Sequence, residues 1–232
     1  MLRWIFKSHK KTATQSSTPG PPHSPGAGVG DLVVAAPQKL DMALRSHRAG
    51  RLSEAEVAYD DVLAVDPENI DALHFLGVIA YQRGEHGRAE KLISRALSRN
   101  ASNAPAYNNL GNALGAQGKL DAAIACYRQA LALQPGYADA WVNLGATFRA
   151  KGEVEKAVQF YHHALSLAPD IPMTHCNLGN ALAQQGKLDN AAACLRKALA
   201  RKPDFPEAYD HLSNTLIGLG RPQEAEEAIA AH

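Results

Sequence analysis

The sequence lacks any long hydrophobic run. No apolar stretch approaches the roughly 20 residues that a helix needs to cross a bilayer, although 46% of the chain is hydrophobic. The first six residues, MLRWIF, form an apolar segment shorter than the ~7 residues of a secretory h-region, and no clear small-residue cleavage site follows. We therefore expect neither a transmembrane helix nor a secretory signal, and a cytoplasmic location.

Cysteine is scarce as well. The chain has 3 cysteines and no Cys-x-x-Cys pair, so a disulfide framework is not indicated. Cys126 and Cys194 occupy equivalent places in the repeat described below, two copies apart. At about 10 Å per stacked helix layer, that separation is too large for a disulfide, whose Cα atoms lie within ~7 Å. Reduced thiols are the expected state.

The chain has little net charge. The formal value is +1, and Arg3, Lys7, Lys10 and Lys11 all precede the first acidic residue, Asp31. Without those four, 20 of the 24 Lys and Arg residues remain against 23 Asp and Glu residues, so the rest of the chain carries about −3. Binding to nucleic acid requires several Lys or Arg contacts to phosphates, and a slightly acidic body argues against it.

Motifs that carry chemistry are also missing. Gly118-Lys119 and Gly186-Lys187 resemble the end of a phosphate-binding loop, but Leu follows each lysine where that loop needs Ser or Thr. His162-His163 lacks a second ligand pair at a matching spacing, so a solvated helix face explains it better. We expect no catalytic residues, no cofactor and no metal site, and therefore no enzyme.

One pattern is written three times at a spacing of 34 residues. The copies read AYNNLGNALGAQGKLDAAIACYRQALALQPGY, AWVNLGATFRAKGEVEKAVQFYHHALSLAPDI and THCNLGNALAQQGKLDNAAACLRKALARKPDF. A fixed period in this range is typical of helical solenoids. Apolar residues flank each Leu-Gly pair at helical spacing, which predicts a first helix in every copy.

Glycine and proline punctuate each copy. Gly118, Gly152 and Gly186 follow the first helix, where a left-handed residue commonly ends a helix. A second helix carries small residues at the contact points and stops at a proline, which cannot donate a backbone hydrogen bond. Gly or Ala at those points, Gly145 among them, lets the two helix axes approach to about 8 Å.

These positions resemble the tetratricopeptide repeat, a 34-residue helix-turn-helix unit with a Leu-Gly pair in its first helix and Ala and Pro in its second. The resemblance implies an all-α fold, a right-handed superhelical solenoid of antiparallel helix pairs. In phase, the repeats fall near residues 36–69, 70–103, 104–137, 138–171, 172–205 and 206–232, the last one incomplete.

Residues 1–35 lie outside the repeat. From Thr12 to Gly30 they are mainly Ser, Thr, Pro and Gly, a composition that buries too little apolar surface to order itself. The alternative is an interfacial anchor, because Trp4, Ile5 and Phe6 beside lysines suit a membrane surface. We favour a disordered tail, and membrane contact, if any, only through this segment.

One polar set rises above the background. Asn109, Asn143 and Asn177 each precede the Leu of a Leu-Gly pair, and asparagine is a mediocre helix former. An amide offers donors and an acceptor, so a row of amides can hold the backbone of an extended peptide without reading its side chains. Three further asparagines follow at a spacing of three residues, namely Asn112, Asn180 and Asn214. Inheritance through recent duplication, with no role, is the competing explanation.

This row resembles the asparagine ladder in the repeat arm of O-linked N-acetylglucosamine transferases, which presents protein substrates to a separate catalytic domain. The row stops at Asp41, Phe75 and His211, so it is short, and that family's catalytic domain is absent from the 232 residues. The carboxylate-clamp repeats that bind chaperone C-termini are a poorer match, because they carry Lys or Arg where this chain has His74, Asn108, Val142, Cys176 and Asp210.

The sequence thus predicts a non-catalytic scaffold that binds an extended peptide segment of a protein partner in its concave groove. The alternative is the substrate-recognition arm of a glycosyltransferase. At the C-terminal end, Leu212, Leu216, Leu219 and Ile229 are expected to leave an apolar face in water, and that expectation predicts self-association through the last repeat.

Overall fold

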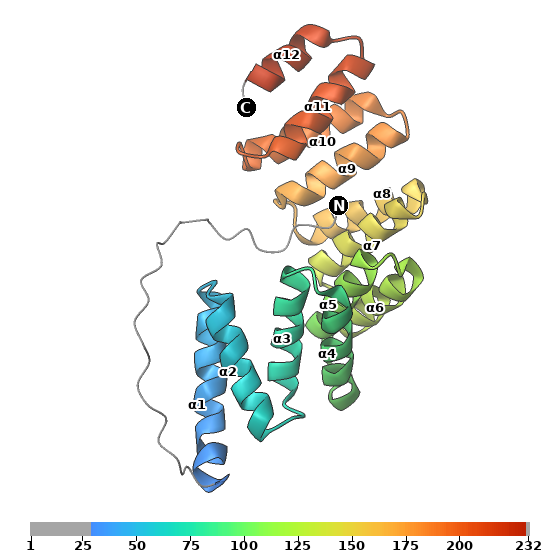
Figure 1. Ribbon diagram of the computed structural model, residues 1–232. Helices are drawn as coiled ribbons and strands as arrows, with labels where there is room; N and C mark the ends of the chain where they lie inside the picture. The colour runs from blue at the N-terminus through green and yellow to red at the C-terminus, as the bar shows by residue number, and fades with distance from the viewer. Residues whose placement is uncertain (1–28, 231–232) are drawn as a thin grey trace. The chain divides into compact units, whose positions relative to one another are not determined.

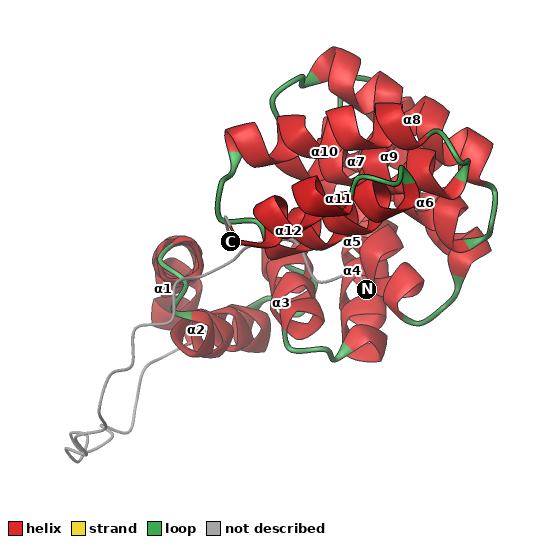
Figure 2. Cartoon of the chain, turned by 90° about the horizontal axis from the view of Figure 1, so that it is seen from above, coloured by secondary structure: helices red, strands yellow, loops and turns green. Residues whose placement is uncertain are grey.

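The computed structural model describes residues 29–230, and these residues form helices joined by short loops, with no strand among them (Figure 2). They divide into two compact units at Ala101 and Ser102. The first unit contains α1 (Val29–Arg48), α2 (Leu52–Val65), α3 (Ile70–Gln82) and α4 (His86–Arg99). The second contains α5 (Ala104–Ala116), α6 (Leu120–Leu133), α7 (Ala138–Ala150), α8 (Val154–Leu167), α9 (Pro172–Gln184), α10 (Leu188–Arg201), α11 (Pro206–Gly218) and α12 (Pro222–Ala230).

Each copy of the repeat is one helical hairpin. Within the units, α1 packs on α2 and α3 on α4, then α5 on α6, α7 on α8, α9 on α10, and α11 on α12 (Figure 1). In the second unit, each hairpin also packs against the next one, through α6 with α7, α8 with α9, and α10 with α11. The predicted all-α architecture of helical hairpin repeats is confirmed.

The Leu-Gly pairs explain how the two helices of a hairpin come so close. A Cβ built on Gly111 would lie 2.5 Å from the Tyr127 ring, and one on Gly145 would lie 2.8 Å from the Tyr161 ring. Tyr127 and Tyr161 are fully buried, so these rings fill the space that each missing side chain leaves. The prediction that small residues set the helix spacing is confirmed.

The turn glycines also behave as predicted. Gly118, Gly152 and Gly186 adopt φ of 77°, 83° and 74°, the left-handed region that residues with a Cβ avoid. The backbone N–H of the next residue then bonds back into the helix, as Lys119 does to the Leu114 carbonyl at 3.0 Å. Each second helix ends two residues before its proline, at Leu133, Leu167 and Arg201.

The two ends of the array differ from the expectations. Helix α1 begins at Val29, so residues 29–35, assigned above to the tail, are helical. The repeat phase could not reveal this, because it begins at residue 36. The disordered-tail and membrane-anchor predictions for residues 1–28 lie outside the described part of the chain.

At the other end, the exposed apolar face was predicted wrongly. Leu212 and Leu216 are only 4% and 1% exposed, and Leu219 is half-buried. Helix α11 packs between α10 and α12, and these two neighbours cover it. Self-association of the last repeat therefore loses the reason given for it.

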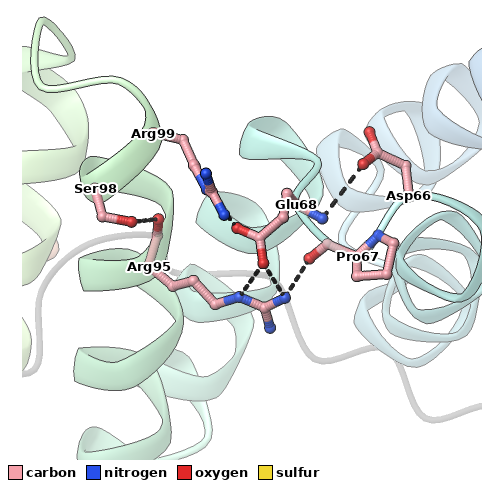
Figure 3. A network of polar contacts seen from close by, with 6 residues as sticks. All are labelled: Asp66, Pro67, Glu68, Arg95, Ser98 and Arg99. Atoms are coloured by element: carbon pink, nitrogen blue, oxygen red, sulfur yellow. Dashed lines mark hydrogen bonds and ion pairs between the residues drawn. The ribbon is translucent and has the colours of Figure 1, made fainter.

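Ion pairs link neighbouring repeats on the exposed edges. Glu68, in the turn before α3, accepts from Arg95 at 2.6 Å and from Arg99 at 2.7 Å, both on α4 (Figure 3). Arg95 also donates to the Pro67 carbonyl. Arg201 and Asp170, at the same repeat positions as Arg99 and Glu68, pair at 2.8 Å. Such exposed pairs contribute little stability singly, but they hold the turns in a fixed register.

Candidate functional site

The asparagine row lies on the first helices of the second unit. Asn109 is on α5, Asn143 on α7 and Asn177 on α9, and all three are half-buried. Helices α5 and α7 pack together, as do α7 and α9, because the repeat returns the chain to the same orientation every two helices. The row therefore presents one amide per repeat on three neighbouring helices.

These amides differ in the hydrogen bonds they already make. Asn143 donates through Nδ2 to Oδ1 of the buried Asn108, at 2.9 Å, so one of its donors links α7 to α5. Its Oδ1 and second N–H are left for other partners. Asn177 makes no side-chain hydrogen bond to the residues that the structure describes.

The second asparagine set, at a spacing of three residues, is not uniform. Asn112 is 3% exposed, and its Oδ1 accepts from the Tyr127 hydroxyl at 2.9 Å. That contact holds the ring that fills the Gly111 gap, so Asn112 belongs to the core and its assignment to a peptide-binding surface does not fit its burial. Asn214, on α11, is exposed.

Asn180 joins two helices through a polar chain. Its Nδ2 lies 3.1 Å from Nε2 of His211 on α11, and its Oδ1 accepts from Gln184 Nε2 at 3.4 Å. His211 and Asn180 are half-buried and Gln184 is exposed. The position where the asparagine row was said to stop is thus bonded to the second asparagine set.

Arg149, on α7, is a site residue that the sequence reasoning missed. It is half-buried, and its Nε is buried without a hydrogen-bond partner among the described residues. Its charge reaches Tyr161, Cys176 and His211, since it acts to lower the pKa of each. The available signal was a departure from the repeat: the equivalent residues in the copies on either side are Gly115 and Ala183.

The thiols and histidines give no sign of catalytic chemistry. Burial raises the pKa of Cys176 to about 12, so this thiol stays protonated at neutral pH, and thiolate is the nucleophilic form. His162 and His163 are exposed on α8, and the ring of His163 meets Trp141 edge-on with centroids 4.3 Å apart. Among the described residues, no group of three or more His, Cys, Asp or Glu side chains is placed to hold a metal.

Within the described part of the chain, no helix combines the length and the apolar character needed to cross a membrane.

Comparison with known proteins gives a consistent family. Sequence models described as tetratricopeptide repeat match residues 47–114, 108–172 and 172–205. Together they cover residues 47–205 without a break, which is more than half of the chain. No curated protein matches this chain in sequence.

Solved structures with the same fold are numerous. A crystal structure of MamA is 28% identical, with a TM-score of 0.62, covering 73% of this chain and 92% of its own. PilW, a widely conserved type IV pilus biogenesis factor, is 23% identical, with a TM-score of 0.77, and the shares are 84% and 91%. YrrB, described as a TPR protein with an unusual peptide-binding site, is 19% identical, with a TM-score of 0.60 and shares of 78% and 97%.

Hairpins of 34 residues, a glycine facing a buried ring or leucine in each central copy, left-handed turn glycines and three adjoining family matches all agree. The chain belongs to the tetratricopeptide repeat family.

Proposed function

We propose that the first helices of the second unit bind an extended segment of a protein partner, with Asn109, Asn143 and Asn177 holding its backbone. The repeats and the TPR relatives support a protein-interaction scaffold. The observation that carries the finer proposal is the row itself: half-buried amides at one position on three neighbouring helices.

The hydrogen-bonding state of the row suits this role. Asn177 has no side-chain partner among the described residues, and Asn143 keeps an acceptor and a donor after bonding Asn108. A half-buried amide that lacks a protein partner is satisfied by water, and a peptide carbonyl or N–H replaces that water at small cost. Purely structural asparagines would resemble Asn112, whose Oδ1 is engaged in the core.

The spacing also suits an extended chain. Helix layers lie about 10 Å apart, and an extended peptide rises ~3.3 Å per residue. One asparagine would then meet roughly every third residue of the bound segment. Such contacts go to the backbone, so they would give affinity with little side-chain selectivity.

YrrB lends support from the same fold, since it is described as having a peptide-binding site. Its identity of 19% limits that support to the architecture. A tetratricopeptide array can present a peptide-binding surface, and the residues that would do so here must come from this chain's own contacts.

The test uses a random 12-residue peptide library displayed on phage and selected against the full chain. Selected peptides, labelled with fluorescein, are then titrated by fluorescence anisotropy against the wild type and a variant with Asn109, Asn143 and Asn177 all changed to Ala. We expect at least tenfold weaker binding by the variant, with the circular dichroism spectrum unchanged because Ala is the better helix former.

The matched control is Asn190→Ala, which removes an exposed amide from α10, a second helix. This control should bind as the wild type does. A folded triple variant with wild-type affinity for every selected peptide would overturn the proposal, and so would a library that yields no binder.

A further inference from the structure

Arg149 stands apart from the other arginines on helices of the second unit. Arg196 pairs with Glu224 at 2.9 Å and Arg201 with Asp170 at 2.8 Å, both on the exposed edges. Arg149 is half-buried, and among the described residues no carboxylate lies within ion-pair distance of it. A partly desolvated guanidinium without a counter-charge is costly unless something supplies one.

The surroundings of Arg149 do not use up its hydrogen-bonding capacity. Its Nε and the Tyr161 hydroxyl are both buried, and neither makes a hydrogen bond of ordinary geometry to a described residue. The equivalent tyrosine in the preceding copy, Tyr127, bonds Asn112. In the Arg149 copy that asparagine is replaced by Ala146, so both the hydroxyl and the guanidinium are left with spare capacity.

Polar groups from two further helices approach the same place. Burial lowers the pKa of His211, and the charge of Arg149 lowers it further. Asn180 bonds His211 and lies one turn after Asn177, on the same face of α9. Arg149, Asn180 and His211 therefore form one cluster across α7, α9 and α11, next to the asparagine row.

Two carboxylates lie near this cluster. Asp210 and Glu207, both exposed on α11, act to raise the pKa of His211, against the effect of Arg149. They weaken the positive potential at the cluster without forming an ion pair with Arg149. Their presence disfavours a phosphate group, which brings a charge of about −1.5 to −2, more than it disfavours a single carboxylate.

We propose that Arg149, with Asn180 and His211, binds one carboxylate of the extended segment held by the asparagine row. The planar guanidinium offers paired donors that match the two oxygens of a carboxylate. The Asn180 amide and the His211 ring supply further donors from the opposite side. This inference rests on the proposed peptide binding and adds the chemical class of the residue recognised.

The experiment uses the full chain and the peptides selected from the 12-residue library. We expect the peptides to share an acidic residue or to bind through their terminal carboxylate. Replacing that Glu by Gln, or amidating the C-terminus, distinguishes the two sources of the carboxylate. Since a hydrogen bond between charged groups is about twice as strong as a neutral one, the responsible change should weaken anisotropy-measured binding by about tenfold.

The protein-side variants complete a double-mutant cycle. Arg149→Gln should weaken binding of the acidic peptide by about tenfold and leave binding of its neutral analogue unchanged. Arg149→Lys should restore part of the loss, because it keeps the charge without the paired donors. Arg128→Gln, an exposed arginine on α6, makes the same change in net charge and should bind as the wild type. Asp210→Asn should strengthen binding.

The outcomes separate this inference from the proposed function. Peptides whose binding depends on the asparagine row but not on Arg149 or on any carboxylate would overturn the inference and leave the proposed function standing. A library without binders would overturn both. If Arg149→Gln unfolds, the Glu→Gln and amidated peptides on the wild-type chain decide alone, and undiminished binding of both would overturn the inference.

Discussion

Replacing Gly145 by alanine places a methyl group into a filled space. The new Cβ would lie 2.8, 3.0 and 3.2 Å from three ring carbons of Tyr161, whereas carbon atoms prefer 3.5–4.0 Å. The Tyr161 ring is fully buried, so it cannot swing into solvent. Either α7 and α8 separate or the ring leaves its preferred rotamer.

Two opposing effects set the magnitude. Overpacking a core contact costs about 1–3 kcal/mol, while alanine in place of glycine inside a helix gains about 1 kcal/mol. The expected net change is a loss of about 1 kcal/mol in the free energy of unfolding, which lowers the melting temperature by a few degrees. Gly145→Leu, with more atoms in the same space, should lose more.

Gly87, on α4, is the matched control. A Cβ there would meet no described atom within 4 Å, so Gly87→Ala should keep the helix-propensity gain and stabilise the chain. The measurements are thermal and urea unfolding by circular dichroism, together with hydrogen exchange, because repeats can unfold separately. If Gly145→Ala melts at or above the wild-type temperature, the tight contact does not limit stability and the reasoning is wrong.

Two further predictions follow from buried polar groups. Tyr127→Phe should cost about 1–3 kcal/mol in urea unfolding, because it leaves the Asn112 amide buried without its partner, whereas Tyr161→Phe, whose hydroxyl is buried without a hydrogen bond of ordinary geometry, should cost almost nothing; equal losses would contradict this account. Burial lowers the pKa of His74 from 6.5 to about 4, so the unfolded chain takes up a proton first, and the stability that the neutral form provides is present above pH 6.5 and lost as pH falls toward 4. His74→Leu should flatten this part of the pH–stability curve, and a curve of unchanged slope would refute the assignment.

Sequence reasoning performs well where the repeat enforces the same physics several times. Leu-Gly pairs, turn glycines and terminal prolines each recur in phase, so one explanation had to satisfy several copies at once. The contact of Gly111 with Tyr127 and that of Gly145 with Tyr161 show why. A steric requirement fixed by backbone geometry leaves the same residue in every copy.

The sequence is less informative where copies differ or end. The start of α1 at Val29 lies before the first repeat, so the period gave no warning of it. The burial of Leu216 depends on how α10 and α12 close over α11, a tertiary detail that the pattern of one helix cannot supply. Asn112 and Asn180 share a repeat position, yet one bonds a core tyrosine and the other His211, because the residues opposite them differ.

Recognition by a repeat array also requires departures from the repeat. A row of equivalent amides alone would let a bound segment slide by one layer, about three residues, and recover the same backbone contacts, so it would fix affinity but not register. Arg149 occurs in one copy, between Gly115 and Ala183 in its neighbours, and a charge at one layer removes that degeneracy. On this reasoning, Arg149→Gln should change which peptide registers are bound as well as how tightly. Crosslinking from a photoreactive residue at fixed positions of the peptide would then give one product pattern with the wild type and several with the variant. A single unchanged pattern would mean that register is set elsewhere.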